Sequence, residues 1–146
     1  MINIPLRVRN LKEKYGTNNP FLLCKFLKIL IIYQDLGNAK GFSIKYLRKK
    51  LICLNENLNE TDSKIVCAHE FGHCMLHQLK DMNFMMAYTK LIRKSNLEKE
   101  ANIFAVELLH DDIHNEYIYK SDISFEVLEE LKGLKNKEWF NYGRFF

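Results

Sequence analysis

Two histidines four positions apart, His69 and His73, enclose a glutamate at position 70 in the segment CAHEFGHCMLH. Residues four apart share one face of an α-helix. In a helix this HExxH spacing lets both imidazoles reach one zinc ion at about 2.0–2.1 Å. Glu70 then projects beside the ion, where a carboxylate can act as a general base toward water. The motif therefore requires a helix and predicts a site for one zinc ion.

The residues around the motif favour such a helix. Asn59 is a good N-cap, and Glu60 and Asp62 complement the helix dipole in the first turn. The helix is predicted to run to about Leu79. Gly72 in its interior costs about 1 kcal/mol relative to alanine. That cost is explained if another backbone passes close to the metal-bearing face.

The third protein ligand has to come from a later segment. The positions three and six after His73 are both leucine, which excludes the HExxHxxGxxH arrangement. Residues 95–98 form a capping box that opens another helix, predicted to end near residue 109. This helix offers Glu98, Glu100 and Glu107. Glu98 is expected to serve the cap and Glu107 lies two turns further on, so Glu100 is the preferred ligand.

The whole chain, residues 1–146, is interpreted as one α+β domain with a small three-stranded sheet packed on helices. Two helices are expected within residues 1–28, an antiparallel or mixed sheet within residues 29–55, and the metal-site helices within residues 59–109. A last helix and an aromatic tail are expected within residues 110–146. The individual segments predicted are helix Pro5–Tyr15, a helix capped by Asn19, strands Ile29–Tyr33, Phe42–Tyr46 and Leu51–Leu54, and helix Ser124–Leu131.

Composition and charge argue against several other classes of protein. The 22 basic and 18 acidic side chains give a net charge of +4 and are scattered, so direct nucleic-acid binding is not expected. No segment is long and apolar enough to span a bilayer, and no signal peptide is visible, so a cytoplasmic protein is expected. The four cysteines form no CxxC pair and are expected to be reduced, buried thiols.

Two motifs together resemble the ImmA/IrrE family of zinc metallopeptidases: HEFGHCMLH at 69–77 and EANIFAVELL at 100–109. The resemblance covers residues from about 41 to 109. It implies a thermolysin-like, gluzincin-type core in which the glutamate that opens the second motif, Glu100, is the third zinc ligand. It also implies a protein substrate in trans, a helix-turn-helix repressor of a mobile element or stress regulon. After residue 109 the family's usual Met-Pro is replaced by His-Asp.

The function predicted from these residues is metal-assisted hydrolysis of a peptide bond. Glu70 would take a proton from water and hand it to the leaving amine. A donor to the oxyanion is expected as well. The sequence does not choose among its candidates, Tyr88, His110, His114 and Tyr117.

Two alternatives to the enzyme stay open. One is a zinc-bound regulator that binds a repressor or toxin partner without cutting it. The other is a structural domain without metal. The presence of Glu70 favours the enzyme, because a binding scaffold needs no general base.

Three further features have more than one interpretation. His77 can be an extra ligand, a group behind a ligand or a buried histidine bonded to backbone, and the last is preferred. Asn102 can orient a ligand or face solvent. An extended substrate is expected to add to the sheet edge formed by the hairpin Phe42–Leu54.

Overall fold

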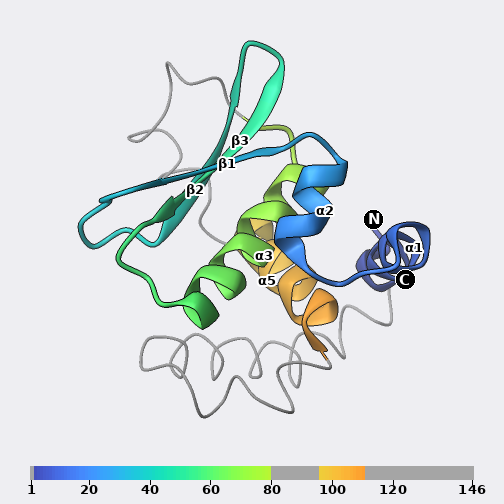
Figure 1. Cartoon of the computed structure of the whole chain (residues 1–146). Coiled ribbons are helices and arrows are strands. Elements are labelled where there is room, and N and C mark those ends of the chain that lie inside the picture. Colours follow the sequence, from blue (N-terminus) through green and yellow to red (C-terminus); the bar gives the residue numbers. More distant parts are fainter. Residues whose placement is uncertain (1, 80–95, 111–146) are drawn as a thin grey trace.

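The computed structural model describes residues 2–79 and 96–110 (Figure 1). Within these ranges the fold is α+β, as predicted, with four helices and a three-stranded mixed sheet. The predicted helix Ser124–Leu131 and the aromatic tail lie outside the described residues. In chain order the elements are α1 (Ile4–Tyr15), α2 (Pro20–Phe26), β1 (Leu30–Gln34), β2 (Gly41–Tyr46), β3 (Lys49–Asn55), α3 (Glu60–Leu76) and α5 (Asn96–Leu108).

The sheet has the order β1-β3-β2, so β3 is central and β2 forms one edge. β1 runs parallel to β3, and β2 runs antiparallel to it. Leu47 and Arg48 join β2 to β3 with φ of 49° and 68°. Two residues of positive φ between paired strands are typical of the tight turn that matches the twist of a hairpin. β3 therefore begins at Lys49, two residues before the predicted strand Leu51–Leu54.

The N-terminus of α3 is capped as the sequence predicts. The side-chain oxygen of Asn59 accepts a hydrogen bond from the backbone N–H of Asp62 at 2.8 Å. This cap satisfies one of the N–H groups that a helix N-terminus leaves without a partner. The cap defines the start of α3, so the HExxH motif at residues 69–73 lies in the interior of a helix.

The C-terminus of α3 comes earlier than expected, at Leu76 and not near Leu79. The next residue, His77, is extended, with φ −122° and ψ 157°, and its N–H still bonds the carbonyl of residue 73 at 3.0 Å. Two cations from distant parts of the sequence bind carbonyls at this helix end: Lys50 donates to residue 74 and Arg7 to residue 75. Positive charge at a helix C-terminus is favourable, so these contacts stabilise the early end.

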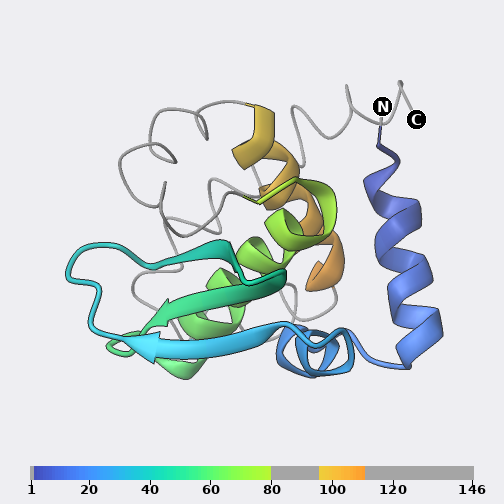
Figure 2. The same ribbon diagram turned by 90° about the horizontal axis from the view of Figure 1, so that it is seen from above.

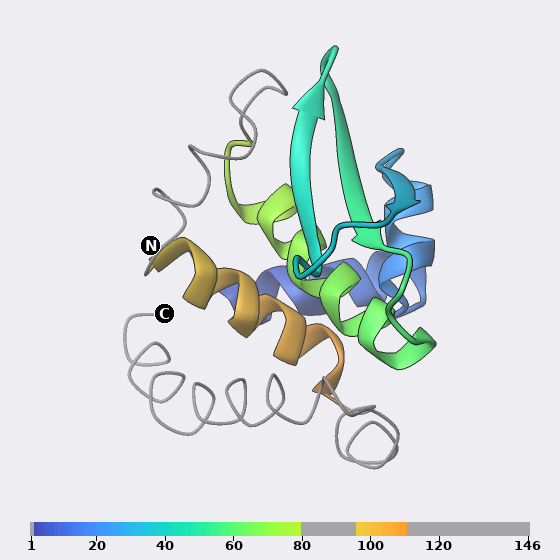
Figure 3. The ribbon, with the colours of Figure 1, turned by 90° about the vertical axis from the view of Figure 1, so that its left-hand side faces the viewer.

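The core lies where α3 is packed between the sheet and α5 (Figure 3). Phe71 of α3 and Phe104 of α5 meet edge to face, with ring centroids 5.4 Å apart. At Gly72 a Cβ atom would lie 3.1 Å from the Cβ of Phe104 and 3.2 Å from the carbonyl oxygen of Ala101. The sequence prediction that another backbone passes close to Gly72 is therefore confirmed, and that backbone is α5.

α1 contacts α5 on the side of the molecule away from the sheet (Figure 2). The four cysteines are buried and none of them forms a disulfide, as expected. Among residues 2–79 and 96–110, no helix is both long and apolar enough to cross a membrane.

Candidate metal centre

The motif residues lie on α3 with both imidazoles on one face. The ring centroids of His69 and His73 are 4.8 Å apart and the rings are nearly perpendicular, at 83°. Glu70 completes a group whose potential ligand atoms all lie within 4.8 Å of one another. Glu70 and His73 are buried. The helix that the motif requires is therefore present, and it brings the three expected groups together.

A carboxylate from α5 bridges the two imidazoles. Oε2 of Glu98 lies 2.9 Å from Nε2 of His69, and its Oε1 lies 3.1 Å from Nε2 of His73. The Glu98 side chain is 37% exposed, whereas that of His73 is only 2% exposed. The point where these three side chains converge therefore has a buried side and a side open to solvent.

Glu100, the ligand expected from the sequence, lies elsewhere. Its Oε1 is 3.2 Å from Nε2 of His77. Positions two apart on a helix do not share a face, so only one of Glu98 and Glu100 can approach the motif imidazoles. The structure brings Glu98 to His69 and His73, whereas the sequence predicted that Glu98 would cap the helix.

The other ring nitrogen of each motif histidine also has a partner. Nδ1 of His69 lies 2.7 Å from the side-chain oxygen of Asn102, and Nδ1 of His73 lies 2.9 Å from Nδ1 of His77. Of the two interpretations left open for Asn102, the structure supports the one in which it orients a histidine. The preferred interpretation of His77, a ring bonded to backbone, is wrong, because both of its nitrogens face side chains.

The electrostatics of the site between Glu98, His69 and His73 favour a bound cation. Burial raises the pKa of the Glu98 carboxyl, but hydrogen bonds from His69 and His73 outweigh it and hold that pKa far below its ordinary value. Burial lowers the pKa of His69, but its bond to Glu98 and the nearby carboxylates outweigh this and raise it. For His73 burial prevails and the pKa is lowered. The ionised carboxylate of Glu98 and the neutral imidazole of His73 are the protonation states that a metal ion needs, whereas the proton favoured on His69 is one that a bound metal would displace.

The donor set and its spacing fit zinc. Two imidazole nitrogens and one carboxylate oxygen are a known catalytic ligand set, with the fourth position open. Bonds of about 2.0–2.1 Å in a tetrahedron separate neighbouring ligand atoms by roughly 3.3 Å. The nitrogen–oxygen distances of 2.9 and 3.1 Å are close to that value, so small side-chain shifts would accommodate the ion.

Comparison with known proteins identifies the family. The model of peptidase family M78, described as the IrrE N-terminal-like domain, matches residues 24–130. The chain belongs to this family. The M78 match begins in α2 and covers the sheet, α3 and α5, so every residue of the candidate centre lies within it.

Two relatives resemble this M78 chain over about three quarters of its length. An uncharacterised immunity region protein 2 of Bacillus phage phi105 is 40% identical over 110 residues, which are 75% of this chain and 69% of that protein. The metallopeptidase ImmA of Bacillus subtilis (strain 168) is 38% identical over 109 residues, 73% of this chain and 62% of that protein. The chain thus spans about two thirds of the length of these relatives. No solved structure matches.

None of the four residues considered as oxyanion donors is placed at the metal centre by the described part of the chain. Tyr88, His114 and Tyr117 lie outside that part. His110 lies beyond Leu108, the last residue of α5, and no contact places it at the metal centre. The donor to the oxyanion therefore stays unassigned.

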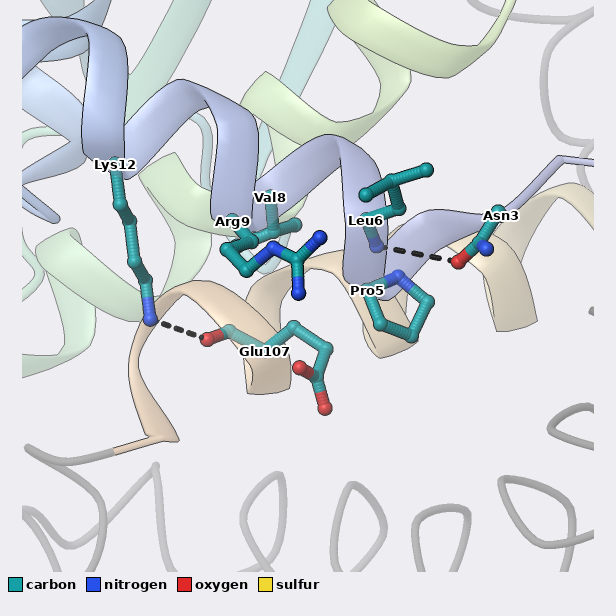
Figure 4. Close-up of a pocket in the computed structure, with 7 residues that line it drawn as sticks. All are labelled: Asn3, Pro5, Leu6, Val8, Arg9, Lys12 and Glu107. Atoms are coloured by element: carbon teal, nitrogen blue, oxygen red, sulfur yellow. Dashed lines mark hydrogen bonds between the residues drawn. The ribbon is translucent and has the colours of Figure 1, made fainter.

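A separate cavity of about 480 Å³ lies between α1 and α5 (Figure 4). At one end Nζ of Lys12 donates to the backbone carbonyl of Glu107 at 3.0 Å. None of the residues that line the cavity belongs to the metal centre, so the two features are distinct. The lining residues are Asn3, Pro5, Leu6, Val8, Arg9, Lys12 and Glu107.

Proposed function

We propose that this chain is a zinc-dependent endopeptidase in which His69, His73 and Glu98 hold the metal and Glu70 is the general base. The observation that carries the proposal is the carboxylate of Glu98, which faces the Nε2 atoms of both histidines beside Glu70. When bound, zinc polarises a carbonyl and lowers the pKa of a water molecule toward 7. The proposed ligand set replaces Glu100 with Glu98, because Glu100 faces His77.

Glu70 is proposed to move the proton. Its carboxylate is buried next to both histidines, so its place relative to the two imidazoles is well defined. It accepts a proton as that water attacks the scissile carbonyl and delivers it to the leaving amine. The exposed side of Glu98 supports access of a polypeptide from solvent.

The proposed substrate is a protein, a helix-turn-helix repressor of a mobile element supplied as a separate chain in the cytoplasm. The names of the two relatives, a metallopeptidase and a phage immunity region protein, support a protein substrate in a phage setting. No direct contact with nucleic acid and no membrane association are proposed.

The edge strand β2 is proposed to bind the substrate in an extended form. A Cβ on Gly41 would lie 2.9 Å from Val66 of α3, and Lys50, which pairs with Lys45 of β2, bonds the carbonyl of residue 74. β2 therefore runs beside the stretch of α3 that carries both histidines. A peptide added to this edge would pass the metal centre along its length.

The test is co-expression with candidate helix-turn-helix repressors from the same genome, comparing the wild type with Glu70→Gln. The wild type is expected to yield a new fragment of the repressor, and Glu70→Gln to bind zinc without producing it. Glu107→Gln, the same chemical change on α5 away from the centre, is the matched control and should cleave normally. A Glu70→Gln protein that keeps the full biological effect without cleavage would favour the non-catalytic regulator instead.

A further inference from the structure

We infer that His77 and Glu100 position His73 as a metal ligand, an inference that rests on the proposed function. The hydrogen-bonded series His73–His77–Glu100 is called the relay. Nδ1 of His73 lies 2.9 Å from Nδ1 of His77, and Nε2 of His77 lies 3.2 Å from Oε1 of Glu100. The relay is largely shielded from water: the side chains of His77 and Glu100 are 8% and 16% exposed. Hydrogen bonds in such surroundings hold their partners more firmly than hydrogen bonds in water.

The order of protons along the relay follows from its geometry. Two Nδ1 atoms 2.9 Å apart share one proton, because one must donate and the other accept. If His73 is to offer the lone pair of Nε2 to a metal while neutral, its proton is on Nδ1, and Nδ1 of His77 is the acceptor. The proton of His77 is then on Nε2, where it is donated to the carboxylate of Glu100. Glu100 thereby fixes the tautomer of both imidazoles.

The two motif histidines are supported from α5 in different ways. Asn102 shares a helix face with Glu98 and reaches Nδ1 of His69 directly. Glu100 lies on another face, and the ring of His77 bridges the gap between it and His73. Residues that bond the outer nitrogen of a ligating histidine fix its ring orientation and raise its basicity.

His77 is well placed to act as a bridge and badly placed to act as a fourth ligand. It stands at the end of α3, where its N–H bonds the carbonyl of His73 at 3.0 Å and fixes the start of its side chain. Its nitrogens face His73 Nδ1 and Glu100, so neither of them faces the carboxylate of Glu98. His77 is thus a positioning residue.

The test measures the zinc affinity of the purified protein by competition with a chelator, together with the melting temperature of the metal-free form. Removing the group behind a ligand costs about 10- to 100-fold in metal affinity. His77→Ala and Glu100→Ala are each expected to weaken zinc binding by that factor. The double variant is expected to bind zinc as His77→Ala does, because Glu100 acts only through His77. Additive losses in the double variant would overturn the relay.

A core substitution separates loss of folding from loss of positioning. Ile103→Val in α5 removes one buried methylene group and should lower the melting temperature without changing the zinc affinity. If His77→Ala proves too unstable to purify, His77→Gln retains a side-chain oxygen that can accept from His73. It should recover part of the affinity. Unchanged zinc affinity in both His77 variants would refute the inference.

Nitrogen-15 NMR of the zinc-loaded wild type reads the tautomers directly. The expected pattern has the proton of His73 on Nδ1 and that of His77 on Nε2, and the opposite tautomer of His77 would overturn the relay. Failure of the wild type to bind zinc would instead overturn the proposed function. Zinc binding that survives unchanged in the His77 and Glu100 variants would refute the relay alone.

Discussion

The side-chain oxygen of Asn102 lies 2.7 Å from Nδ1 of His69, one helical turn after Glu98 on the same face of α5. A single turn of α5 therefore presents both a carboxylate to Nε2 of His69 and an acceptor to its Nδ1. This arrangement defines the His69 tautomer, because an amide oxygen can only accept. The packing of α5 against α3 thus decides whether the histidines of α3 can act as metal ligands.

Asn102→Ala is expected to weaken zinc binding by about 10- to 100-fold, because the ring of His69 loses the acceptor that orients it. Asn102→Asp keeps an acceptor of the same size and should retain most of the affinity. Chelator competition on the purified proteins measures both. Equal affinities for the alanine variant and the wild type would show that Asn102 does not orient His69.

Glu98→Gln is expected to abolish stoichiometric zinc binding, because the centre loses its charged ligand. Ligand binding stabilises a fold by roughly 4 kcal/mol at a thousand times its dissociation constant. The wild type should therefore melt at a lower temperature after treatment with a chelator, and Glu98→Gln should melt at one temperature with or without it. Glu100→Gln serves as the comparison and should still respond to zinc. A Glu98→Gln protein that keeps one zinc per chain would remove Glu98 from the ligand set.

The sequence was sufficient to predict the helix that brings His69, Glu70 and His73 together. The spacing of His69 and His73 demands a helix, Asn59 marks its start, and Gly72 indicates a close neighbour; the structure agrees on each. These features are local, because they depend on residues within a few turns of one helix. The α+β class follows in the same way from short segments of apolar periodicity.

The choice between Glu98 and Glu100 could not be made in that way. Both lie near the N-terminus of α5, and the rotation of that helix about its axis decides which one faces His69. That rotation is set by packing against α3, a contact between segments far apart in the chain. The spacing of Glu98 and Asn102, four residues apart, was the available signal, because both can contact one imidazole only from the same face.

Gly72→Ala tests how closely α5 must approach. The new Cβ would lie 3.1 Å from that of Phe104 and 3.2 Å from the carbonyl oxygen of Ala101, so α5 has to move by a few tenths of an ångström. Alanine gains about 1 kcal/mol in helix propensity, while overpacking a core costs about 1–3 kcal/mol. A small net loss of stability is expected, with a larger loss of zinc affinity because Glu98 moves with α5. Gly72→Val should be worse in both measurements, and an alanine variant with full zinc affinity would contradict the argument.

Lys50→Met tests the contact that closes the C-terminus of α3. Its ammonium group donates to the carbonyl of residue 74, directly after His73, and a hydrogen bond from a charged group contributes about 1.5–3 kcal/mol. A loss of about 1–2 kcal/mol is expected because Lys50 is only partly buried, which corresponds to a few degrees in melting temperature. Lys49→Met, the same change at an exposed neighbour, is the matched control and should melt within about a degree of the wild type. Equal melting temperatures for the two variants would show that the contact contributes nothing.

The two edges of the sheet offer a matched test of where the substrate binds. Tyr46 lies on β2 and Tyr33 on β1, the opposite edge, and their exposures are nearly equal at 50% and 52%. A photo-crosslinking residue at position 46, in a Glu70→Gln background that holds the substrate uncut, is expected to capture the repressor. The same residue at position 33 should not, because β1 is the edge away from the strand that runs beside α3. Capture from position 33 alone would place the substrate on the wrong edge for the proposed path, whatever the outcome of the metal experiments.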